Sequence, residues 1–196
     1  MRKSEIKRKT KETNIKLVLD LDTPFEGPID SGSPFLDHML DLLRKHAGLG
    51  LSVECKGDKD IDMHHSCEDI AICLGEALKS ACGDKQGLER YGFYYVTMDE
   101  ALARCCLDLS GRIGFVYNAA IPNARIGNLD TELIEHFFRS VAENAKMNLH
   151  LDLLRGVNTH HCIEGLFKAF ARALAMAVSP SRRIQGIPSS KGTLDA

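Results

Sequence analysis

Two stretches of this chain repeat one pattern of residues. Residues 35–57 and 133–156 each place an acid–histidine pair in an apolar helical pattern and follow it with an alternating strand. A further helical stretch then opens on a histidine doublet, HHSCEDIAICLGEAL from His64 and HHCIEGLFKAFARAL from His160. Corresponding histidines and glutamates lie 96 to 98 positions apart. Order, element type and ionisable residues agree together, so the sequence predicts an internal duplication.

Three further stretches alternate apolar and polar residues, as half-buried strands do: Asn14–Asp22, Gly92–Asp99 and Leu102–Ser110. Each half then reads strand, strand, helix, strand, helix. This order predicts an α+β fold of internally duplicated half-domains, each a small, mostly antiparallel sheet covered by helices. We expect the first half over residues 1–91, the second over 92–187 and a C-terminal loop over 188–196, all in one compact unit.

Composition narrows the classes of function. The net charge of −2 gives no general attraction to nucleic acid or to a membrane, so any anion site must be a local cluster. The seven cysteines form no CxxC pair, which argues against a disulfide framework and for reduced, buried thiols. The basic residues 1–11 lack the apolar core of a secretory signal, and there is no run of about 18 apolar residues. We expect a soluble, cytoplasmic protein.

The repeated histidines and glutamates have the chemistry of metal ligands. Imidazole suits borderline divalent ions, and carboxylate suits harder ions such as Mn²⁺. Residues three and four apart share a helix face, so each glutamate lies near both histidines of its doublet. A lone buried histidine is more often a hydrogen-bonded core residue than a metal ligand. Two matching copies of the histidine doublet and its glutamate, however, favour metal binding. The predicted ligands, enough for two ions with open positions, are His38, His64, His65, Glu68, His136, His160, His161 and Glu164.

The acidic residues near these ligands can be interpreted in two ways. They either orient the ligating imidazoles or belong to a solvated helix face; they are Asp37, Asp62, Asp69 and Glu135. His46 and His150 have no counterpart in the repeat, and we expect both on the surface.

Five ordered motifs carry a family resemblance: PFLDHML, DMHHSCED, MDEALARCCLDLSGR, HHCIEGLFKAFARAL and PSSKGTL. Together they resemble the imidazoleglycerol-phosphate dehydratase family of histidine biosynthesis, from about Arg8 to Leu194. The resemblance implies a duplicated α+β fold and a homo-oligomer of twenty-four subunits with shared active sites. It also implies two Mn²⁺ ions per active site, held by the predicted ligands above.

The resemblance further implies a reaction. Family members remove water from D-erythro-imidazole glycerol phosphate and give imidazole acetol phosphate. Two cations would hold the substrate's imidazole as imidazolate, a Lewis-acid role. A carboxylate would transfer the proton, and the candidates are Glu164 and Glu12, the latter in a segment that matches the family's RxTxET pattern.

A substrate with phosphate at one end requires something that the symmetric histidine set lacks. Lys168 stands one helical turn after Glu164, where the first repeat has Ile72. Cationic and hydroxyl side chains in family-like motifs are suited to phosphate. The candidates for substrate binding are Glu12, Arg90, Arg112, Lys168, Ser189, Ser190, Lys191 and Asp99, the last of which could instead be structural.

Some positions depart from the family pattern. Leu42 stands where many relatives have glutamine, and Ser66 and Gly165 replace a more usual threonine and alanine. Two other functions remain open at this point. A two-metal hydrolase of a small phosphorylated substrate would release phosphate instead of a ketone, and a metal-storage or structural assembly protein would show no turnover.

Overall fold

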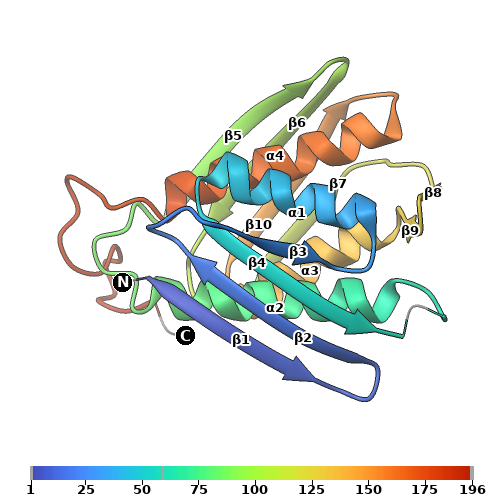
Figure 1. Ribbon diagram of the computed structural model, residues 1–196. Helices are drawn as coiled ribbons and strands as arrows, with labels where there is room; N and C mark the ends of the chain where they lie inside the picture. The colour runs from blue at the N-terminus through green and yellow to red at the C-terminus, as the bar shows by residue number, and fades with distance from the viewer. Residues whose placement is uncertain (1, 59, 195–196) are drawn as a thin grey trace.

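The structure, a computed structural model, describes residues 2–58 and 60–194. Residue 1 of the predicted first half and residues 195 and 196 of the predicted tail lie outside the described residues, as does residue 59. Figure 1 shows two sheets with helices between them, and the strands of each sheet come from one half of the chain.

The first half forms a four-stranded sheet and two helices. Its elements are β1 (Lys3–Lys9), β2 (Thr13–Asp20), β3 (Glu26–Asp30), α1 (Pro34–Ala47), β4 (Gly50–Gly57) and α2 (His64–Cys82). The strand order is β1-β2-β4-β3, antiparallel except that β3 runs parallel to β4. In β2, Ile15, Leu17 and Leu19 are buried while Asn14 and Lys16 are exposed, so the sheet has one covered face.

The second half repeats this topology. Its elements are β5 (Tyr91–Met98), β6 (Ala101–Asp108), β7 (Gly114–Asn118), β8 (Arg125–Ile126), β9 (Leu129–Asp130), α3 (Leu133–Ala145), β10 (Asn148–Arg155) and α4 (Thr159–Ala177). The strand order is β5-β6-β10-β7, and β7 runs parallel to β10 as β3 does to β4. The predicted fold class is therefore confirmed. The short hairpin of β8 and β9 is an addition to the second half.

In each half, three strands of the four-stranded sheet precede the first helix, not the two that the pattern predicts, and the second half also has the unpredicted β8–β9 hairpin. The strands of the four-stranded sheets that the alternation does not reveal, β1, β3 and β7, all lie at sheet edges. β1 reads KSEIKRK and has Ile6 as its only large apolar residue, and β3 contains Pro28. An edge strand can bury little apolar surface and tolerates proline, so these three sequences lack the usual pattern, whereas the fourth edge strand, β5, keeps its alternation.

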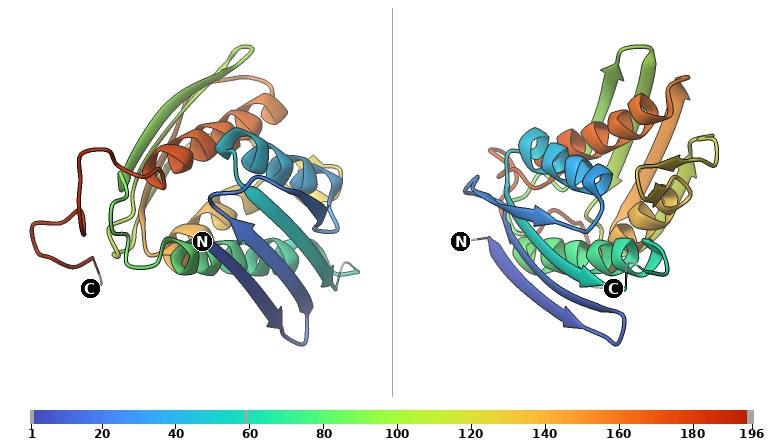
Figure 2. Two further views of the ribbon diagram at one scale, coloured as in Figure 1. Left: turned by 60° about the vertical axis from the view of Figure 1, so that its left-hand side comes forward. Right: turned by 45° about the vertical axis from the view of Figure 1, so that its right-hand side comes forward.

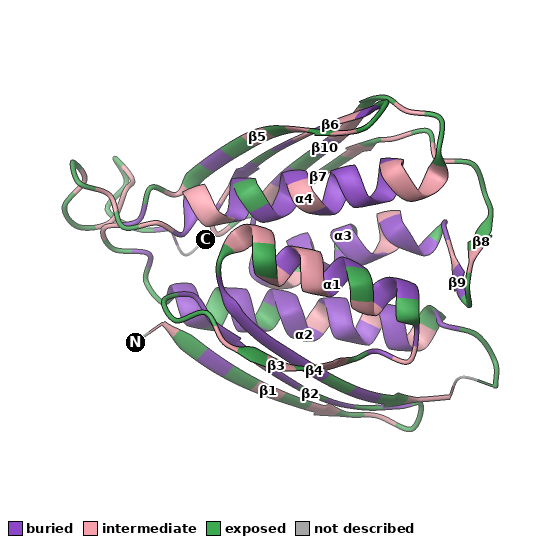
Figure 3. Ribbon diagram, turned by 45° about the horizontal axis from the view of Figure 1, so that its top comes forward, coloured by how far each residue is buried: buried purple, intermediate pink, exposed green. Residues whose placement is uncertain are grey.

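The helices lie between the two sheets, as Figures 2 and 3 show. α2 packs on β1 and β2, and α4 packs on β5 and β6. α1 contacts α4, and α2 contacts α3, so the two halves pair through their helices. Within the second half, four buried phenylalanine rings also join α3 to α4, with centroids 4.7 to 5.5 Å apart: Phe137, Phe138, Phe167 and Phe170.

The four helices all begin at the same end of the molecule, on the right in Figure 1. The C-terminal tail lies at the opposite end, on the left. Pro34 starts α1, where its fixed φ suits the first turn. The Asn158 side chain caps α4 by accepting hydrogen bonds from the backbone N–H groups of His160 and His161. The histidine doublets are therefore gathered at one end of the helical layer.

The cysteines behave largely as expected. No disulfide joins the seven cysteines, all of which lie in the described residues; six are buried, whereas Cys106 is exposed. Burial raises the pKa of the Cys67 thiol to about 12, so this side chain remains a neutral, small apolar group. Among the described residues, none of the helices has both the length and the apolar character needed to cross a membrane.

Replacing Gly92 with alanine should destabilise the fold. A Cβ at this position would lie 1.8 Å from the Ala173 carbonyl oxygen, so β5 and α4 would have to separate. We expect the free energy of unfolding to fall by roughly 1–3 kcal/mol, the usual cost of overpacking. The measurement is the midpoint of urea denaturation followed by circular dichroism.

The control is Gly165→Ala within α4. Its added Cβ would meet only the Ala103 methyl group, at an ordinary 3.4 Å. Alanine is the better helix former, so this variant should be more stable by up to about 1 kcal/mol. Equal midpoints for the two variants would show that the β5–α4 approach is not tight.

Candidate metal centre

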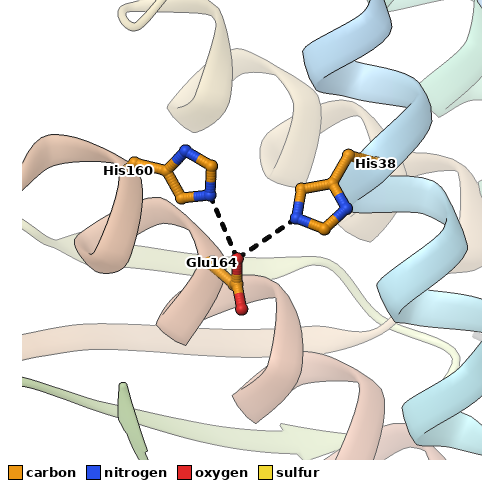
Figure 4. A group of neighbouring side chains, drawn as sticks. All are labelled: His38, His160 and Glu164. Atoms are coloured by element: carbon orange, nitrogen blue, oxygen red, sulfur yellow. Dashed lines mark hydrogen bonds and ion pairs between the residues drawn. The ribbon is translucent and has the colours of Figure 1, made fainter. Parts of the chain in front are cut away.

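The first cluster of metal-binding side chains joins α1 to α4. His38 comes from the first half, and His160 and Glu164 come from the second. Both imidazole Nε2 atoms point at the same Glu164 oxygen, at 3.2 Å from His38 and 3.1 Å from His160 (Figure 4). One donor atom from each residue lies within 4.8 Å of the others. An ion held about 2.1 Å from each donor would fit this spacing.

The second cluster joins α2 to α3. His64 and Glu68 come from the first half and His136 from the second, again with donor atoms within 4.8 Å of one another. The Nε2 atom of His136 lies 3.2 Å from a Glu68 carboxylate oxygen, and the rings of His64 and His136 are 5.0 Å apart. Each cluster therefore takes two ligands from one half and one histidine from the other, a division that the repeat alone leaves open.

Two observations fit a bound divalent cation at these clusters. The Nε2 atom of His136 is buried, and it makes no hydrogen bond within the described chain, because its approach to Glu68 lacks hydrogen-bonding geometry. A buried nitrogen without a partner is costly unless an ion binds it. In the first cluster, burial raises the pKa of Glu164, but hydrogen bonds from Lys168 and His38 outweigh that effect and lower it. The Glu164 side chain is therefore anionic, which is the form that a metal ligand requires.

His65 and His161, the second histidines of the doublets, lie outside both clusters. The Nδ1 atom of His65 is 3.0 Å from the Asp58 carboxylate, and that of His161 is 2.8 Å from the Glu100 carboxylate. These hydrogen bonds raise the pKa of both imidazoles, and the bond from His161 lowers the pKa of Glu100 to about 2. Six of the eight predicted ligands thus gather in one chain, and two face elsewhere.

The remaining nitrogens of these two histidines face the turns of two hairpins. The Nε2 atom of His65 lies 3.8 Å from Glu12, in the β1–β2 turn. The Nε2 atom of His161 lies 3.8 Å from Asp99, in the β5–β6 turn. The Asp99 side chain is 72% exposed, and its backbone has a φ of 48°. Aspartate tolerates this left-handed conformation well, so the residue also suits the tight turn.

The turn that carries Glu12 is fixed from α2. Asp69 accepts hydrogen bonds from Arg8 and Thr13, one on each strand of the hairpin. The Glu12 side chain is 52% exposed and makes no hydrogen bond within the described residues. The predicted Arg8–Thr13 motif is therefore mostly an anchor that presents one carboxylate, free of hydrogen bonds in the described chain, next to His65.

Lys168 lies at the first cluster. Its Nζ atom is 2.6 Å from Glu164 and 3.5 Å from the Met98 sulfur. The corresponding position on α2 is Ile72, so the second cluster has no such cation. The two clusters are therefore chemically unequal despite their common origin.

The other predicted phosphate donors meet at the far end of the chain. A cavity of about 390 Å³ is lined by Arg90, Tyr91, Ser110, Arg112, Ser189, Ser190, Lys191, Thr193 and Leu194. The backbone N–H of Arg90 donates to the carbonyl of Ala177, at the end of α4. His160 lies in the first turn of the same helix, and a rise of 1.5 Å per residue places it roughly 25 Å from Ala177. The first cluster and this cavity are therefore not one site within a single chain.

The cations that line this cavity are not equivalent. Arg90 forms two hydrogen bonds with Asp108 and a third with the Pro188 carbonyl, at 2.6, 3.0 and 2.7 Å. Its charge is compensated, and it holds the tail against β6. The side chains of Arg112 and Lys191 pair with no carboxylate in the described part of the chain, so they are the cations available to an anion.

The four acids near the predicted ligands contact groups other than imidazoles in the described chain. Asp37 accepts the backbone N–H of Ser31, and Glu135 pairs with Arg139. Asp62 accepts the backbone N–H of His64 at the start of α2. None of the four acids, Asp69 included, contacts an imidazole ring in the described structure. His150 is exposed as expected, whereas His46 is half-buried.

Asp58 and Glu100, which do contact imidazoles, were not among the predicted residues. Both lie in connections between elements, which show neither helical nor strand periodicity. In neither case does the other repeat have, at the corresponding position, an acid that also contacts a histidine Nδ1 atom, so the repeat gives no signal. A sequence signal existed only for Glu100, which directly follows Asp99 in the family-like MDEA motif.

Removing the Arg90 side chain should release the tail. In Arg90→Ala, Pro188 loses its anchor, so the backbone amides of residues 189–192 should exchange with deuterium faster. Hydrogen–deuterium exchange with mass spectrometry measures this. Arg182→Ala, at an exposed arginine, is the matched control and should leave the exchange unchanged. Unaltered protection in Arg90→Ala would contradict the anchoring role.

Comparison with known proteins identifies relatives along nearly the whole chain. The family model described as imidazoleglycerol-phosphate dehydratase matches residues 31–174. A protein of that name from Halorhodospira halophila is 53% identical over 194 residues, which span 98% of this chain and 98% of the relative. Another from Lactiplantibacillus plantarum is also 53% identical over 194 residues, covering 99% of this chain and 100% of the relative.

Solved structures agree with these sequence relatives. The crystal structure of imidazoleglycerol-phosphate dehydratase from Staphylococcus aureus matches with a TM-score of 0.83 at 41% identity, over 91% of this chain and 99% of that one. The Pyrococcus furiosus protein, solved in complex with (S)-C348, matches with a TM-score of 0.82 at 30% identity, over 96% and 99%. With its paired histidine clusters and its duplicated fold, the chain belongs to the imidazoleglycerol-phosphate dehydratase family.

Proposed function

We propose that this chain dehydrates D-erythro-imidazole glycerol phosphate to imidazole acetol phosphate at a centre of two Mn²⁺ ions. Its family is that of a carbon–oxygen lyase of histidine biosynthesis. The observation that carries the proposal is the pair of clusters, each with two imidazoles and one carboxylate. These six side chains would hold the two ions at which the substrate's imidazole binds.

The ligand set suits manganese. Each cluster offers two nitrogen donors and one oxygen donor, which leaves half of an octahedral sphere for other groups. When bound, the ions would supply Lewis acidity, stabilising negative charge on the substrate's imidazole. We propose that His65 and His161 bring each ion a fourth protein ligand.

That fourth ligand must come from a neighbouring copy, so we propose an assembly with shared active sites. His65 and His161 lie outside the clusters of their own chain. The cavity with Arg112 and Lys191 is roughly 25 Å from the first cluster along α4, far longer than a three-carbon chain can span. A homo-oligomer, in the family's manner twenty-four subunits, would bring these parts together.

The chain's own residues divide the remaining work. Arg112, Lys191, Ser189 and Ser190 would bind the phosphate, and Arg90 would hold the tail that carries three of them. Fixing the phosphate orients the carbon chain against the metal clusters.

Glu12 is the stronger candidate for moving the proton. Glu164 receives hydrogen bonds from Lys168, His38 and His160, so its carboxylate is already occupied. The Glu12 carboxylate accepts no hydrogen bond in the described chain, has only a 3.8 Å contact with His65, and lies at an anchored turn. We propose that it takes the proton from the substrate carbon next to the one that loses hydroxide.

Two further expectations belong to this proposal. The division into residues 1–91 and 92–187 is supported by β5, which follows the link after α2 and begins at Tyr91, within one residue of this boundary. A cytoplasmic location is supported by the seven cysteines, which form no disulfide with one another, whereas an oxidising compartment favours disulfides.

The central test is formation of the ketone product by protein stripped with a chelator and then supplied with Mn²⁺. We expect no turnover without metal and recovery on its addition. His65→Ala should lose bound manganese, measured by mass spectrometry of the metal, together with activity. Full metal content and turnover in this variant would refute the ligand assignment, and release of inorganic phosphate would favour a two-metal hydrolase.

Shared active sites predict that two inactive variants rescue each other. His65→Ala lacks a ligand and Arg112→Ala lacks a phosphate cation, so each alone should be inactive or nearly so. If one site takes these residues from different chains, random mixing restores roughly one site in four. The measurement is ketone formation by the co-expressed and co-purified variants. Activity no higher than that of the separate variants would place both residues in one chain's site.

A further inference from the structure

The two histidines outside the clusters share one feature that the proposed reaction does not explain. Each has its Nδ1 atom on a carboxylate, His65 on Asp58 at 3.0 Å and His161 on Glu100 at 2.8 Å. A neutral imidazole carries one N–H, and a carboxylate partner places it on Nδ1. The Nε2 atom then keeps its lone pair, which is the form that binds a metal.

The two carboxylates reach these histidines from different places in the repeat. Glu100 directly precedes β6, and its counterpart in the first half is Glu12, which directly precedes β2. Asp58 follows β4, and the segment after β10, Gly156-Val157-Asn158, contains no acid. A carboxylate therefore contacts the Nδ1 atom of the second histidine in both halves, but it comes from a position in one half that does not correspond to its position in the other. A chance surface contact would not be expected to recur in this way.

Glu100 is fully committed to this arrangement. One of its oxygens accepts from the backbone N–H groups of Val157 and Asn158, at 3.1 and 2.8 Å, and the other accepts from His161. The β5–β6 turn, the loop before α4 and the imidazole are thereby held by one side chain.

In the first half, the β1–β2 turn, the loop before α2 and the His65 imidazole are held together without the Glu12 side chain. The backbone N–H of Asp58 donates to the Glu12 carbonyl at 3.1 Å, which ties the loop to the β1–β2 turn. The Asp58 carboxylate takes the His65 Nδ1 atom. The Glu12 carboxylate remains without a hydrogen bond in the described chain and lies 3.8 Å from Nε2, the metal-facing side of the ring.

We propose that Asp58 and Glu100 are positioning residues that fix His65 and His161 as Nε2 ligands, and that Asp58 replaces Glu12 in this task. The replacement frees Glu12 to act on the substrate, while its counterpart Glu100 stays structural. This inference rests on the proposed function, because it takes the two histidines as ligands and Glu12 as the group that moves the proton.

The first test measures Mn²⁺ affinity in metal-free full-length protein, by the loss of the free-ion signal in electron paramagnetic resonance. Asp58→Ala and Glu100→Ala should each bind 10–100-fold more weakly, the usual effect of removing a histidine's outer partner. Asp58→Asn keeps an oxygen that accepts the Nδ1 hydrogen, so it should recover most of the affinity. Asp60→Ala, an exposed acid in the same loop, is the matched control and should bind as the wild type.

The second test separates the two carboxylates by turnover at saturating Mn²⁺. Glu100→Ala should regain most of its kcat once the sites are filled. Asp58→Ala should stay at least tenfold lower, because Glu12 can swing onto the vacated Nδ1 atom as Glu100 does in the other half. Recovery of kcat in Asp58→Ala would overturn the replacement of Glu12.

Unchanged Mn²⁺ affinity in both alanine variants would overturn the positioning role. His65→Ala distinguishes this failure from failure of the proposed function. If His65→Ala loses manganese while both acid variants keep it, only the positioning inference falls. If His65→Ala keeps manganese, the ligand assignment itself falls. Asp58→Asn, which is nearly isosteric, keeps the test usable if Asp58→Ala does not fold.

Discussion

The packing of helices from opposite halves, α1 on α4 and α2 on α3, is the interaction on which the rest of this molecule depends. Each contact brings a single histidine of one half to a histidine and a glutamate of the other. The buried Phe137, Phe138, Phe167 and Phe170 rings hold α3 against α4, so the helices that carry the ligands cannot slide independently. A dense apolar core thus sets the spacing of polar groups at its rim.

The sheets contribute through their turns. Hairpins β1–β2 and β5–β6 extend to the end where the helices begin, and their turns carry Glu12 and Asp99-Glu100 beside the second histidines of the doublets. Asp69 clamps the first hairpin from α2, and Glu100 clamps the second to the loop before α4. Strands backed by helices therefore fix the backbone of the turns that carry these carboxylates, which places them within reach of the clusters for acid–base chemistry.

Much of this could be predicted from the sequence, because the repeated residues mark both the fold and the ligands. Helical spacing placed Glu68 and Glu164 beside their doublets, and alternation identified β2, β4, β5, β6 and β10. Edge strands β1, β3 and β7 bury too little to leave a pattern. The division of ligands between clusters depends on which helices pair, a long-range property. Asp58 was missed because its contact with His65 depends on the path of a loop.

Fusion of two equivalent halves in one polypeptide has a consequence for how such a centre can evolve. In a dimer of identical halves, every mutation would alter both halves of the site. Here the link between α2 and β5 lets one side vary alone, as with Lys168 opposite Ile72 and Glu12 opposite Glu100. A pseudo-symmetric site can then bind an asymmetric small molecule, because a few side chains that differ between the halves determine which way round the molecule lies.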